Sequence, residues 1–168
     1  KFSNKKLSEN SIIKPISKYG LTKLKGENYI KKKLKKKIPF CIGRIFSFTS
    51  TNQSKDYIIP SILDKAQSKK KIILFNNVNH YRDFLSINDI CRAISILMRK
   101  RATGIYNIGS GNKILISNII KIIFKKFNKK YFFKETSKST CLVCNNSKMK
   151  KLNWKPKKNI QSILTDLF

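Results

Sequence analysis

The chain has 168 residues, of which 40% are hydrophobic and 11% aromatic, and its formal net charge at pH 7 is +30. A chain of this length and composition can bury a core as a single domain, and its aromatic content argues against intrinsic disorder. Its longest apolar run, residues 114–124, is interrupted by Ser117, Asn118 and Lys121, and it is shorter than the ~20 residues that a membrane-spanning helix needs. We therefore expect neither membrane insertion nor a secretory signal peptide.

The strong positive charge first suggests a nucleic acid or an anionic membrane as the partner. Arginine, the residue best suited to bidentate phosphate and base contacts, is scarce among the 38 basic residues. The excess is lysine, accompanied by abundant isoleucine and asparagine, and all three have AT-rich codons. We attribute the charge mainly to codon bias on solvated faces. Nonspecific adhesion to polyanions is expected, but no specific nucleic-acid partner.

The four cysteines do not form a metal-site pattern. Cys41 and Cys91 lie in apolar periodic segments, where we expect buried thiols. Cys141 and Cys144 form a single CxxC, whereas a structural zinc site needs four ligands and His80 is remote in the sequence. The sequence therefore predicts no metal site, and inert thiols in a reducing cytoplasm.

β-rich runs alternate with helical patterns along the chain. We expect, in chain order, a loop at 1–15, a helix at 17–37, a strand at 38–46, a loop at 47–56, a helix at 57–67, a strand at 71–75, a turn at 76–81, a strand at 82–87, a helix at 89–101, a strand and glycine turn at 104–111, a helix at 117–127, a strand at 130–135, and short helices at 147–154 and 160–168. Strands alternating with helices in this way predict an α/β fold with a mainly parallel sheet.

Several residues are expected to begin or shape these helices. Ser17 is suited to cap the helix at 17–37, with Pro15 just outside it. Asn88 or Asp89 is expected to cap the helix at 89–101, and Ser117 the helix at 117–127. The apolar face of this last helix should consist of Ile119, Ile120, Ile123, Phe124 and Phe127.

Tyr19 and Lys23 are candidate catalytic residues. Positions i and i+4 share one face of a helix, and a nearby ammonium stabilises a phenolate, so such a tyrosine can exchange protons with a hydroxyl or carbonyl. Tyr29 and Lys33 have the same spacing, which arises by chance in a lysine-rich chain. The stretch after Lys33 reads as a solvated helix end. The spacing alone therefore identifies no site.

The residues around Tyr19 are more informative. Residues 15–27, PISKYGLTKLKGE, resemble the "P-x-S-x-Y-G-x-S/T-K-x-x-x-E" segment of extended short-chain dehydrogenase/reductases, in the NAD-dependent epimerase/dehydratase family. Four later stretches resemble motifs of the same family in the same order: RIF at 44–46, RDFLSINDICRAI at 82–94, GIYNIGSG at 104–111 and NSKMKKLNWKP at 146–156. Together they cover nearly the whole chain.

This resemblance implies roles for matching positions. Tyr19 would be the acid/base, and Lys23 would hold the nicotinamide ribose of NAD or NADP and tune the tyrosine. Phe46 would lie near the nicotinamide, and Arg82 would bind the diphosphate of a nucleotide sugar. Ser47 replaces the usual Asn at a substrate-contacting position, which leaves the sugar preference open.

Structural alternatives stand beside these roles. Arg82 could instead pair with Asp83 or Asp89 on the surface. Glu27 is expected to have a structural or helix-pairing role. The GSG at 109–111 lacks the third glycine of a dinucleotide-binding loop, so we interpret it as a turn.

The resemblance also implies the fold and its division. We expect the C-terminal part of a Rossmann-type extended short-chain dehydrogenase/reductase fold with a small substrate-binding subdomain, lacking the N-terminal βαβ units. Residues 1–52 would be the remnant of the dinucleotide-binding domain. Residues 53–168 would form mainly the substrate-binding subdomain, with about 82–101 packing back on the Rossmann part.

The function expected from the resemblance is that of an NAD(P)-dependent nucleotide-sugar epimerase, dehydratase or 4-keto reductase. The substrate would be a nucleotide sugar, the parent enzyme a cytoplasmic homodimer, and the isolated chain inactive. Two alternatives remain at this point. One is a basic nucleic-acid-binding module, and the other is a non-catalytic truncated relic.

Overall fold

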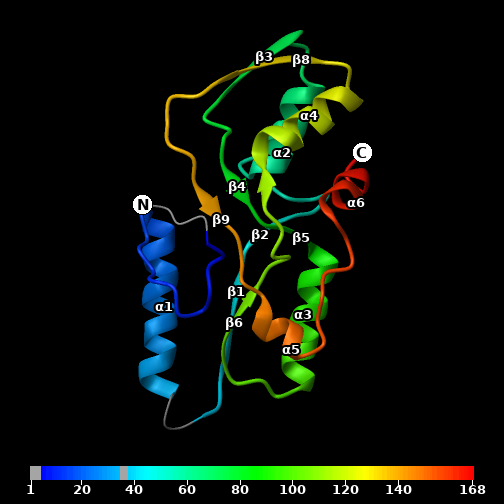
Figure 1. Ribbon diagram of the computed structural model, residues 1–168. Coiled ribbons are helices and arrows are strands. Elements are labelled where there is room, and N and C mark those ends of the chain that lie inside the picture. The colour runs from blue at the N-terminus through cyan, green and yellow to red at the C-terminus, as the bar shows by residue number, and fades with distance from the viewer. Residues whose placement is uncertain (1–4, 35–37) are drawn as a thin grey trace.

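The structure is a computed structural model that describes residues 5–34 and 38–168 (Figure 1). The helices are α1 (Lys18–Leu34), α2 (Ile58–Gln67), α3 (Ile87–Arg99), α4 (Ile116–Lys126), α5 (Ser147–Lys151) and α6 (Ile160–Thr165). The strands are β1 (Cys41–Ile45), β2 (Ser47–Thr49), β3 (Ile72–Asn76), β4 (Tyr81–Arg82), β5 (Phe84–Ser86), β6 (Gly104–Ile108), β7 (Ile114–Leu115), β8 (Lys130–Lys134) and β9 (Cys141–Leu142). The predicted end of the first helix, at 35–37, lies outside the described residues.

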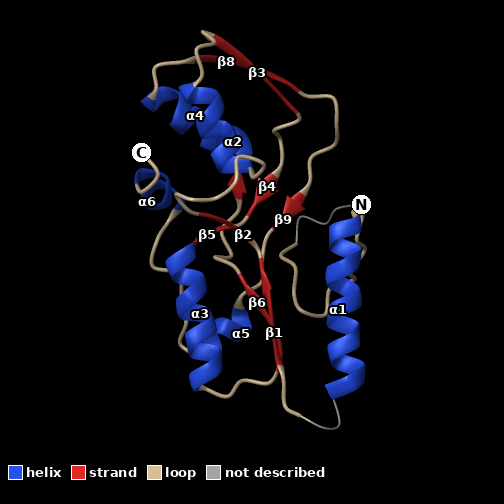
Figure 2. Cartoon of the chain, turned by 180° about the vertical axis from the view of Figure 1, so that it is seen from behind, coloured by secondary structure: helices blue, strands red, loops and turns tan. Residues whose placement is uncertain are grey.

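Strand pairing in the described residues is mainly parallel. β1 pairs with β6, β2 with β5, and β3 with β8, all in parallel, and β4 lies between parallel β9 and antiparallel β7. Helices α1 and α3 lie on opposite sides of the β1–β6 pair (Figure 2). The prediction of an α/β fold with mainly parallel pairing is confirmed.

Two hydrophobic cores hold the structure together. In the first, α2 and α4 pack against one face of β3 and β8 (Figure 1). The predicted apolar face of α4 is confirmed, since Ile119, Ile120, Ile123 and Phe124 are fully buried there and Phe127 is partly buried against them. Edge-to-face contact between Phe75 and Phe124, with ring centroids 5.2 Å apart, adds to this packing.

The second core lies between α3, α5 and the strands β5 and β6. Its buried residues are Leu85, Ile90, Ala93, Leu97, Ile108, Met149 and Trp154. The buried Trp154 donates its Nε1–H to the carbonyl of Asp89 at 3.2 Å. This bond fastens the segment after α5 to the first turn of α3.

The N-cap predicted for α1 is confirmed. The Ser17 hydroxyl accepts the backbone N–H of Gly20 at 3.1 Å, as an N-cap side chain should. A Cβ added at Gly20 would lie 3.2 Å from the Cβ of Pro15 and 3.3 Å from the Ser17 hydroxyl. The glycine after Tyr19 therefore lets the chain before α1 fold back closely onto the first turn.

The caps predicted for α3 and α4 are wrong. Ser86 caps α3, and its hydroxyl accepts the N–H of Asp89 at 3.1 Å while donating to the Asp89 carboxylate at 3.0 Å. Ser86 is therefore the cap, and Asp89 is the residue that it binds through both the N–H and the carboxylate. α4 starts one residue before Ser117, with Leu115 at the N-cap, because the Ile116 N–H donates to the carbonyl of His80.

Two strand predictions and two burial predictions also need correction. The strand expected at 82–87 is split at Asp83, where the chain passes from the β7–β4–β9 sheet to the β2–β5 pair. The loop expected at 47–56 contains β2. Cys41 and Cys91 are exposed. Cys91 follows the buried Ile90 by one residue, which turns it away from the core. Cys41 begins β1 on the side that lines an open groove facing α3.

Candidate active site

The first turn of α1 lies at the carboxyl end of β1. Figure 1 shows α1 running antiparallel to β1, so the start of the helix and the end of the strand meet at one end of the β1–β6 pair. Tyr19 is the second residue of α1, and Phe46 and Ser47 directly follow β1. Ligands of open α/β sheets bind outside the carboxyl ends of parallel strands. This is therefore the end of the sheet where a ligand site is expected.

Tyr19 and Lys23 face each other on α1. The Lys23 Nζ lies 5.3 Å from the centroid of the Tyr19 ring, and the Tyr19 side chain is 73% exposed. Within the described residues no group hydrogen-bonds to the Tyr19 hydroxyl. An exposed phenol beside an ammonium can exchange a proton with a bound hydroxyl or carbonyl.

Tyr29 and Lys33 repeat this local geometry. The Lys33 Nζ lies 5.9 Å from the Tyr29 ring centroid, and Tyr29 is 64% exposed. The two pairs therefore differ in position rather than in internal arrangement. Tyr29 lies about 15 Å farther along the helix axis, away from the carboxyl end of β1. Of the two pairs, Tyr19–Lys23 is the one at the carboxyl end of β1, where open α/β sheets generally bind ligands.

Glu27 fastens α1 to β1. Its carboxylate accepts hydrogen bonds from the Arg44 guanidinium at 2.5 and 2.9 Å and pairs with Lys31 at 2.5 Å. Arg44 also donates to the carbonyl of Glu9 at 2.8 Å. The structural role predicted for Glu27 is confirmed. Since Tyr19, Lys23 and Glu27 share α1, this bidentate pair sets where the tyrosine lies relative to the strand.

The same pair makes the stability of the chain depend on pH. The hydrogen bonds from Arg44 lower the pKa of Glu27 from its ordinary 4.5 to about 2. Its contribution to stability is therefore complete above pH 4.5 and is lost as the pH falls towards 2. We expect Glu27→Gln to lower the free energy of unfolding by about 1–3 kcal/mol at pH 7 and by much less at pH 3, in urea titrations at both pH values.

A matched control for this experiment is Asp64→Asn, which removes an exposed ion pair with Lys55 and should change stability by under about 1 kcal/mol. An equal loss of stability for Glu27→Gln at pH 7 and pH 3 would contradict the assigned role of the carboxylate.

Phe46 and Ser47 connect the two halves of the structure. The Phe46 N–H donates to the carbonyl of Ile108 at 2.9 Å, which extends the β1–β6 pairing by one bond. Ser47 begins β2 and lies opposite Phe84 in the parallel β2–β5 pair. Both residues are partly buried. The chain therefore reaches the neighbourhood of Arg82, two residues before Phe84, directly from the end of β1.

Arg82 forms no ion pair within the described residues. Its Nη1 donates to the carbonyl of Tyr81 at 2.8 Å and to the Thr140 hydroxyl at 3.0 Å. The carboxylates of Asp83 and Asp89, the partners that the alternative interpretation required, bind other groups. Burial lowers the pKa of the Arg82 guanidinium, which nevertheless keeps its charge at neutral pH. Arg82 is thus a half-buried cation without a counter-ion in the described chain.

Lys113 lies close to this arginine and was not predicted as a site residue. Its Nζ lies 4.1 Å from the Tyr81 ring centroid, and the next residue, Ile114, pairs with Arg82 across β4 and β7. Lys113 therefore directly precedes the strand β7 that pairs with Arg82 in β4. The sequence offered no signal for this arrangement, because the antiparallel contact joins segments about thirty residues apart.

Asp83 is a second residue that the sequence did not single out. It is fully buried, and its carboxylate accepts the N–H groups of Ser110 at 2.7 Å, Gly111 at 2.8 Å and Cys144 at 3.1 Å, and the Ser110 hydroxyl at 2.6 Å. The interpretation of GSG as a structural turn is confirmed, since its amides bind this carboxylate. A Cβ at Gly109 would lie only 2.4 Å from the Cys144 Cβ.

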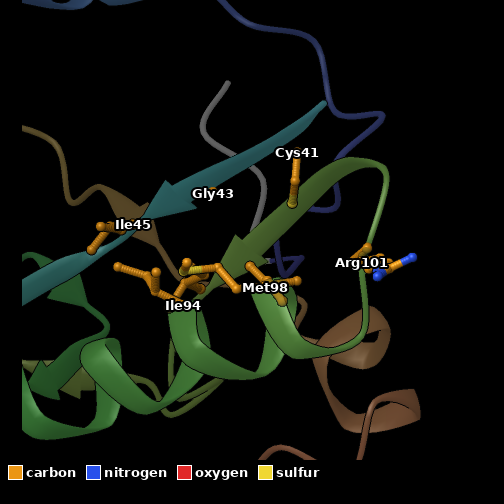
Figure 3. Close-up of a pocket in the computed structure, with 9 residues that line it drawn as sticks. Cys41, Gly43, Ile45, Ile94, Met98 and Arg101 are labelled. Carbon is orange, nitrogen blue, oxygen red and sulfur yellow. The ribbon is translucent and has the colours of Figure 1, made fainter. Parts of the chain in front are cut away.

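An apolar groove of ≈300 Å³ lies between β1 and α3 (Figure 3). Ile45 from β1 and Ile94 and Met98 from α3 border it, and all three are exposed. In the described part of the chain β1 pairs with β6 alone, so its other edge carries unpaired backbone groups. Parallel sheets are normally covered on both faces and blunted at their edges. The unpaired edge of β1 and the apolar groove beside it therefore lack the covering that such a sheet normally has.

The described residues, 5–34 and 38–168, contain neither a metal-binding cluster nor a membrane-spanning helix. No group of three or more His, Cys, Asp or Glu side chains there could hold a metal ion. Cys141 and Cys144 are buried free thiols, and burial raises the pKa of Cys144. No described helix has the length and apolar character needed to cross a bilayer.

Comparison with known proteins identifies the family. A sequence model of the NAD dependent epimerase/dehydratase family matches residues 2–109, which is more than half of the chain. The chain belongs to this family. The resemblance found in the YGLTK, RIF, RDFLSI and GIYNIG stretches is thereby confirmed.

Individual family members match the epimerase/dehydratase chain over most of its length. The dTDP-D-glucose 4,6-dehydratase of Dictyostelium discoideum is 30% identical over 122 residues, 71% of this chain and 28% of that protein. The dTDP-4-dehydro-6-deoxyglucose reductase of Escherichia coli is 29% identical over 133 residues, 76% of this chain and 42% of that protein. The chain therefore spans less than half the length of these two curated relatives.

A solved structure confirms the fold. The crystal structure of dTDP-glucose 4,6-dehydratase from Bacillus anthracis in complex with NAD matches with a TM-score of 0.84 at 22% identity. The match covers 97% of this chain and 54% of that one. The chain thus has part of a Rossmann-like short-chain dehydrogenase/reductase fold.

Proposed function

We propose that this chain is the C-terminal portion of an NAD(P)-dependent enzyme that epimerises, dehydrates or reduces the sugar of a nucleotide sugar. The observation that carries the proposal is the location of Tyr19 and Lys23 at the carboxyl end of β1, in a member of the epimerase/dehydratase family. The Bacillus anthracis dehydratase was solved with NAD, and the Dictyostelium and Escherichia coli relatives are named for dTDP-sugar substrates.

In this proposal a bound nicotinamide cofactor would supply hydride transfer at a sugar carbon. Tyr19 removes or supplies the proton of the sugar oxygen, and the Lys23 ammonium stabilises the phenolate. The Tyr19 side chain is exposed, and its hydroxyl has no hydrogen-bond partner among residues 5–34 and 38–168, which fits this role. Lys23 and Phe46 would hold the nicotinamide end of the cofactor. The sequence contains no G-x-G-x-x-G loop, so residues for the pyrophosphate end are not part of this chain.

We also propose the division of the chain into 1–52, part of the dinucleotide-binding domain, and 53–168, mainly the substrate-binding subdomain. The contact of α3 with β1 and its own hydrophobic core with β6 support packing of about 82–101 against the first part. The open edge of β1 and the groove beside it supply the surface on which the remainder of a dinucleotide-binding sheet would pair.

Two further features belong to the proposal. The parent would be a homodimer that pairs through α1, a helix whose side chains are all at least partly exposed. Its compartment would be the cytoplasm, which suits four free thiols.

The experiment that tests this function compares the isolated chain with the chain joined to a dinucleotide-binding half from a family member. The isolated chain should bind NAD only weakly, and the joined protein should convert a dTDP- or UDP-sugar. Micromolar NAD binding and turnover by the isolated chain would overturn the proposed division. A joined protein that binds NAD but converts no nucleotide sugar would overturn the proposed activity.

Arg82 and Ser47 are the proposed substrate contacts, and Arg82 gives a testable effect. A fork of donors without a counter-ion suits the diphosphate of the substrate. In the joined protein, Arg82→Gln should raise KM for the nucleotide sugar by about 10- to 100-fold with a smaller change in kcat. Arg99→Gln, on the exposed side of α3, should leave KM unchanged. An unaltered KM for Arg82→Gln would remove the residue from the substrate site.

A further inference from the structure

An exposed apolar patch covers the outer face of the β3–β8 pair. Figure 1 shows these strands at one extremity of the molecule, with α2 and α4 beneath them. Their inward side chains belong to the first core, whereas Ile72, Leu74 and Phe132 point outward and are 53%, 56% and 60% exposed. Successive residues of a strand alternate between faces, so these three share the outer one.

The three side chains are neighbours on this face. Leu74 and Phe132 are register partners across the parallel pair, and Ile72 precedes Leu74 by two residues on the same strand. Core formation does not explain them, because the core already contains the opposite face of both strands. The three side chains stand on the exposed face of the strand pair, at one extremity of the molecule (Figure 1).

Lysines surround this patch. Lys130 is the register partner of Ile72, and Lys134 is the partner of Asn76, so Phe132 lies between two lysines on the same outer face. Lys69, Lys70 and Lys71 lead into β3 and are exposed. Lys129, just before β8, donates hydrogen bonds to the carbonyls of Ser68 and Lys70 at 2.8 and 3.2 Å, which joins it to the segment before β3.

Within the described residues nothing neutralises these lysines. Lys71, Lys130 and Lys134 have neither an ion pair nor a hydrogen-bond acceptor there. The adjacent carboxylate, Glu135, accepts the N–H groups of Val78 and Asn79 at 2.9 and 3.1 Å. Asp64, on α2, pairs with Lys55. The outer face is therefore apolar in its centre and positive around it.

This combination selects one kind of partner. A second copy would bring lysines against lysines. A nucleic-acid duplex would meet three apolar side chains where it needs cations, and a single strand, which stacks its bases on several aromatic side chains, would find only Phe132 among the described residues of this face. An anionic bilayer offers apolar acyl chains beneath a layer of phosphates, which matches both parts of the patch. We propose that the outer face of β3–β8 docks peripherally on an anionic lipid surface, through Ile72, Leu74 and Phe132 and the surrounding lysines. The inference is independent of the proposed enzymatic function.

The test measures co-sedimentation of the chain with vesicles of phosphatidylcholine containing one-third phosphatidylglycerol, and with pure phosphatidylcholine. We expect partitioning on the anionic vesicles that falls with salt, and little on the neutral ones. Leu74→Ser with Phe132→Ser should weaken partitioning about tenfold or more, and Lys130→Gln with Lys134→Gln about fivefold or more. The matched control, Ile12→Ser with Tyr29→Ser, removes exposed apolar side chains elsewhere and should bind as the unchanged chain does.

A second readout does not depend on loss of binding. Phe132→Trp places a reporter in the patch, while the native Trp154 is buried and should not respond. The fluorescence emission of the tryptophan introduced by Phe132→Trp should shift to shorter wavelength on anionic vesicles. The proposal is overturned if the Leu74/Phe132 variant binds unchanged, if the control loses as much, or if the reporter does not shift while the chain sediments. Those outcomes would mean that the chain adheres to anionic vesicles through its general positive charge, or that the patch binds a protein instead of a lipid surface.

Discussion

Tyr19→Phe, in the chain joined to a dinucleotide-binding half, should lower kcat by about 10²- to 10⁴-fold. The variant keeps the ring and its contact with Lys23 but removes the hydroxyl that would carry the proton. NAD affinity, measured by fluorescence titration, should change little because the aromatic contact remains. The measurement is the rate of conversion of a dTDP- or UDP-sugar at saturating substrate.

The chain contains its own matched control for this variant. Tyr29→Phe alters a tyrosine with the same spacing to a lysine, the same helix and a similar exposure. It should leave kcat unchanged, since Tyr29 lies two to three turns away from the carboxyl end of β1. Equal losses in the two variants would show that the tyrosines act through the stability of α1, and no loss in either would exclude Tyr19 as the proton carrier.

The second large effect concerns stability. Asp83→Ala should lower the free energy of unfolding by about 3–5 kcal/mol, because three buried N–H groups and a hydroxyl lose their acceptor. The site is fully buried, so water cannot replace the carboxylate without local opening. Urea denaturation followed by far-ultraviolet circular dichroism measures the change.

A milder variant covers the case in which Asp83→Ala does not fold. Asp83→Asn keeps one accepting oxygen and should lose about half as much stability. Asp166→Asn removes an exposed ion pair with Lys158 and should change stability by under about 1 kcal/mol. If Asp83→Ala were as stable as the unchanged chain, the Asp83 network would not hold the glycine turn.

Local pattern predicted much of the fold. The apolar spacing of α4 and the Ser17 cap are short-range features, and both were confirmed. The error at the α3 cap was local, since Ser86 lies only three residues before Asp89. The errors at β4 and α4 arose where distant segments decide. β4 ends at Asp83 because that carboxylate binds amides of residues 110, 111 and 144. α4 begins at Ile116 because its N–H finds the carbonyl of His80.

The candidate site likewise has features that the sequence predicted and features that depend on contacts between distant segments. Motif order in the sequence pointed to the family and to Tyr19, Lys23, Phe46, Ser47 and Arg82 as candidates. It could not separate Tyr19 from Tyr29 by spacing, since any tyrosine four residues before a lysine on a helix makes the same local contact. The direction of α1 against β1, held by Glu27 and Arg44, makes the distinction.

The sequence by itself determined the family, the alternation of strands and helices, and the candidate residues, because these depend on residue identity and on spacing within one element. The tertiary structure alone decided which elements meet. It brought the start of α1 to the end of β1, set Lys113 beside Tyr81 and Arg82, and left Ile72, Leu74 and Phe132 outside the core. Contacts between segments tens of residues apart depend on how the whole chain packs, and periodicity within a segment does not encode them.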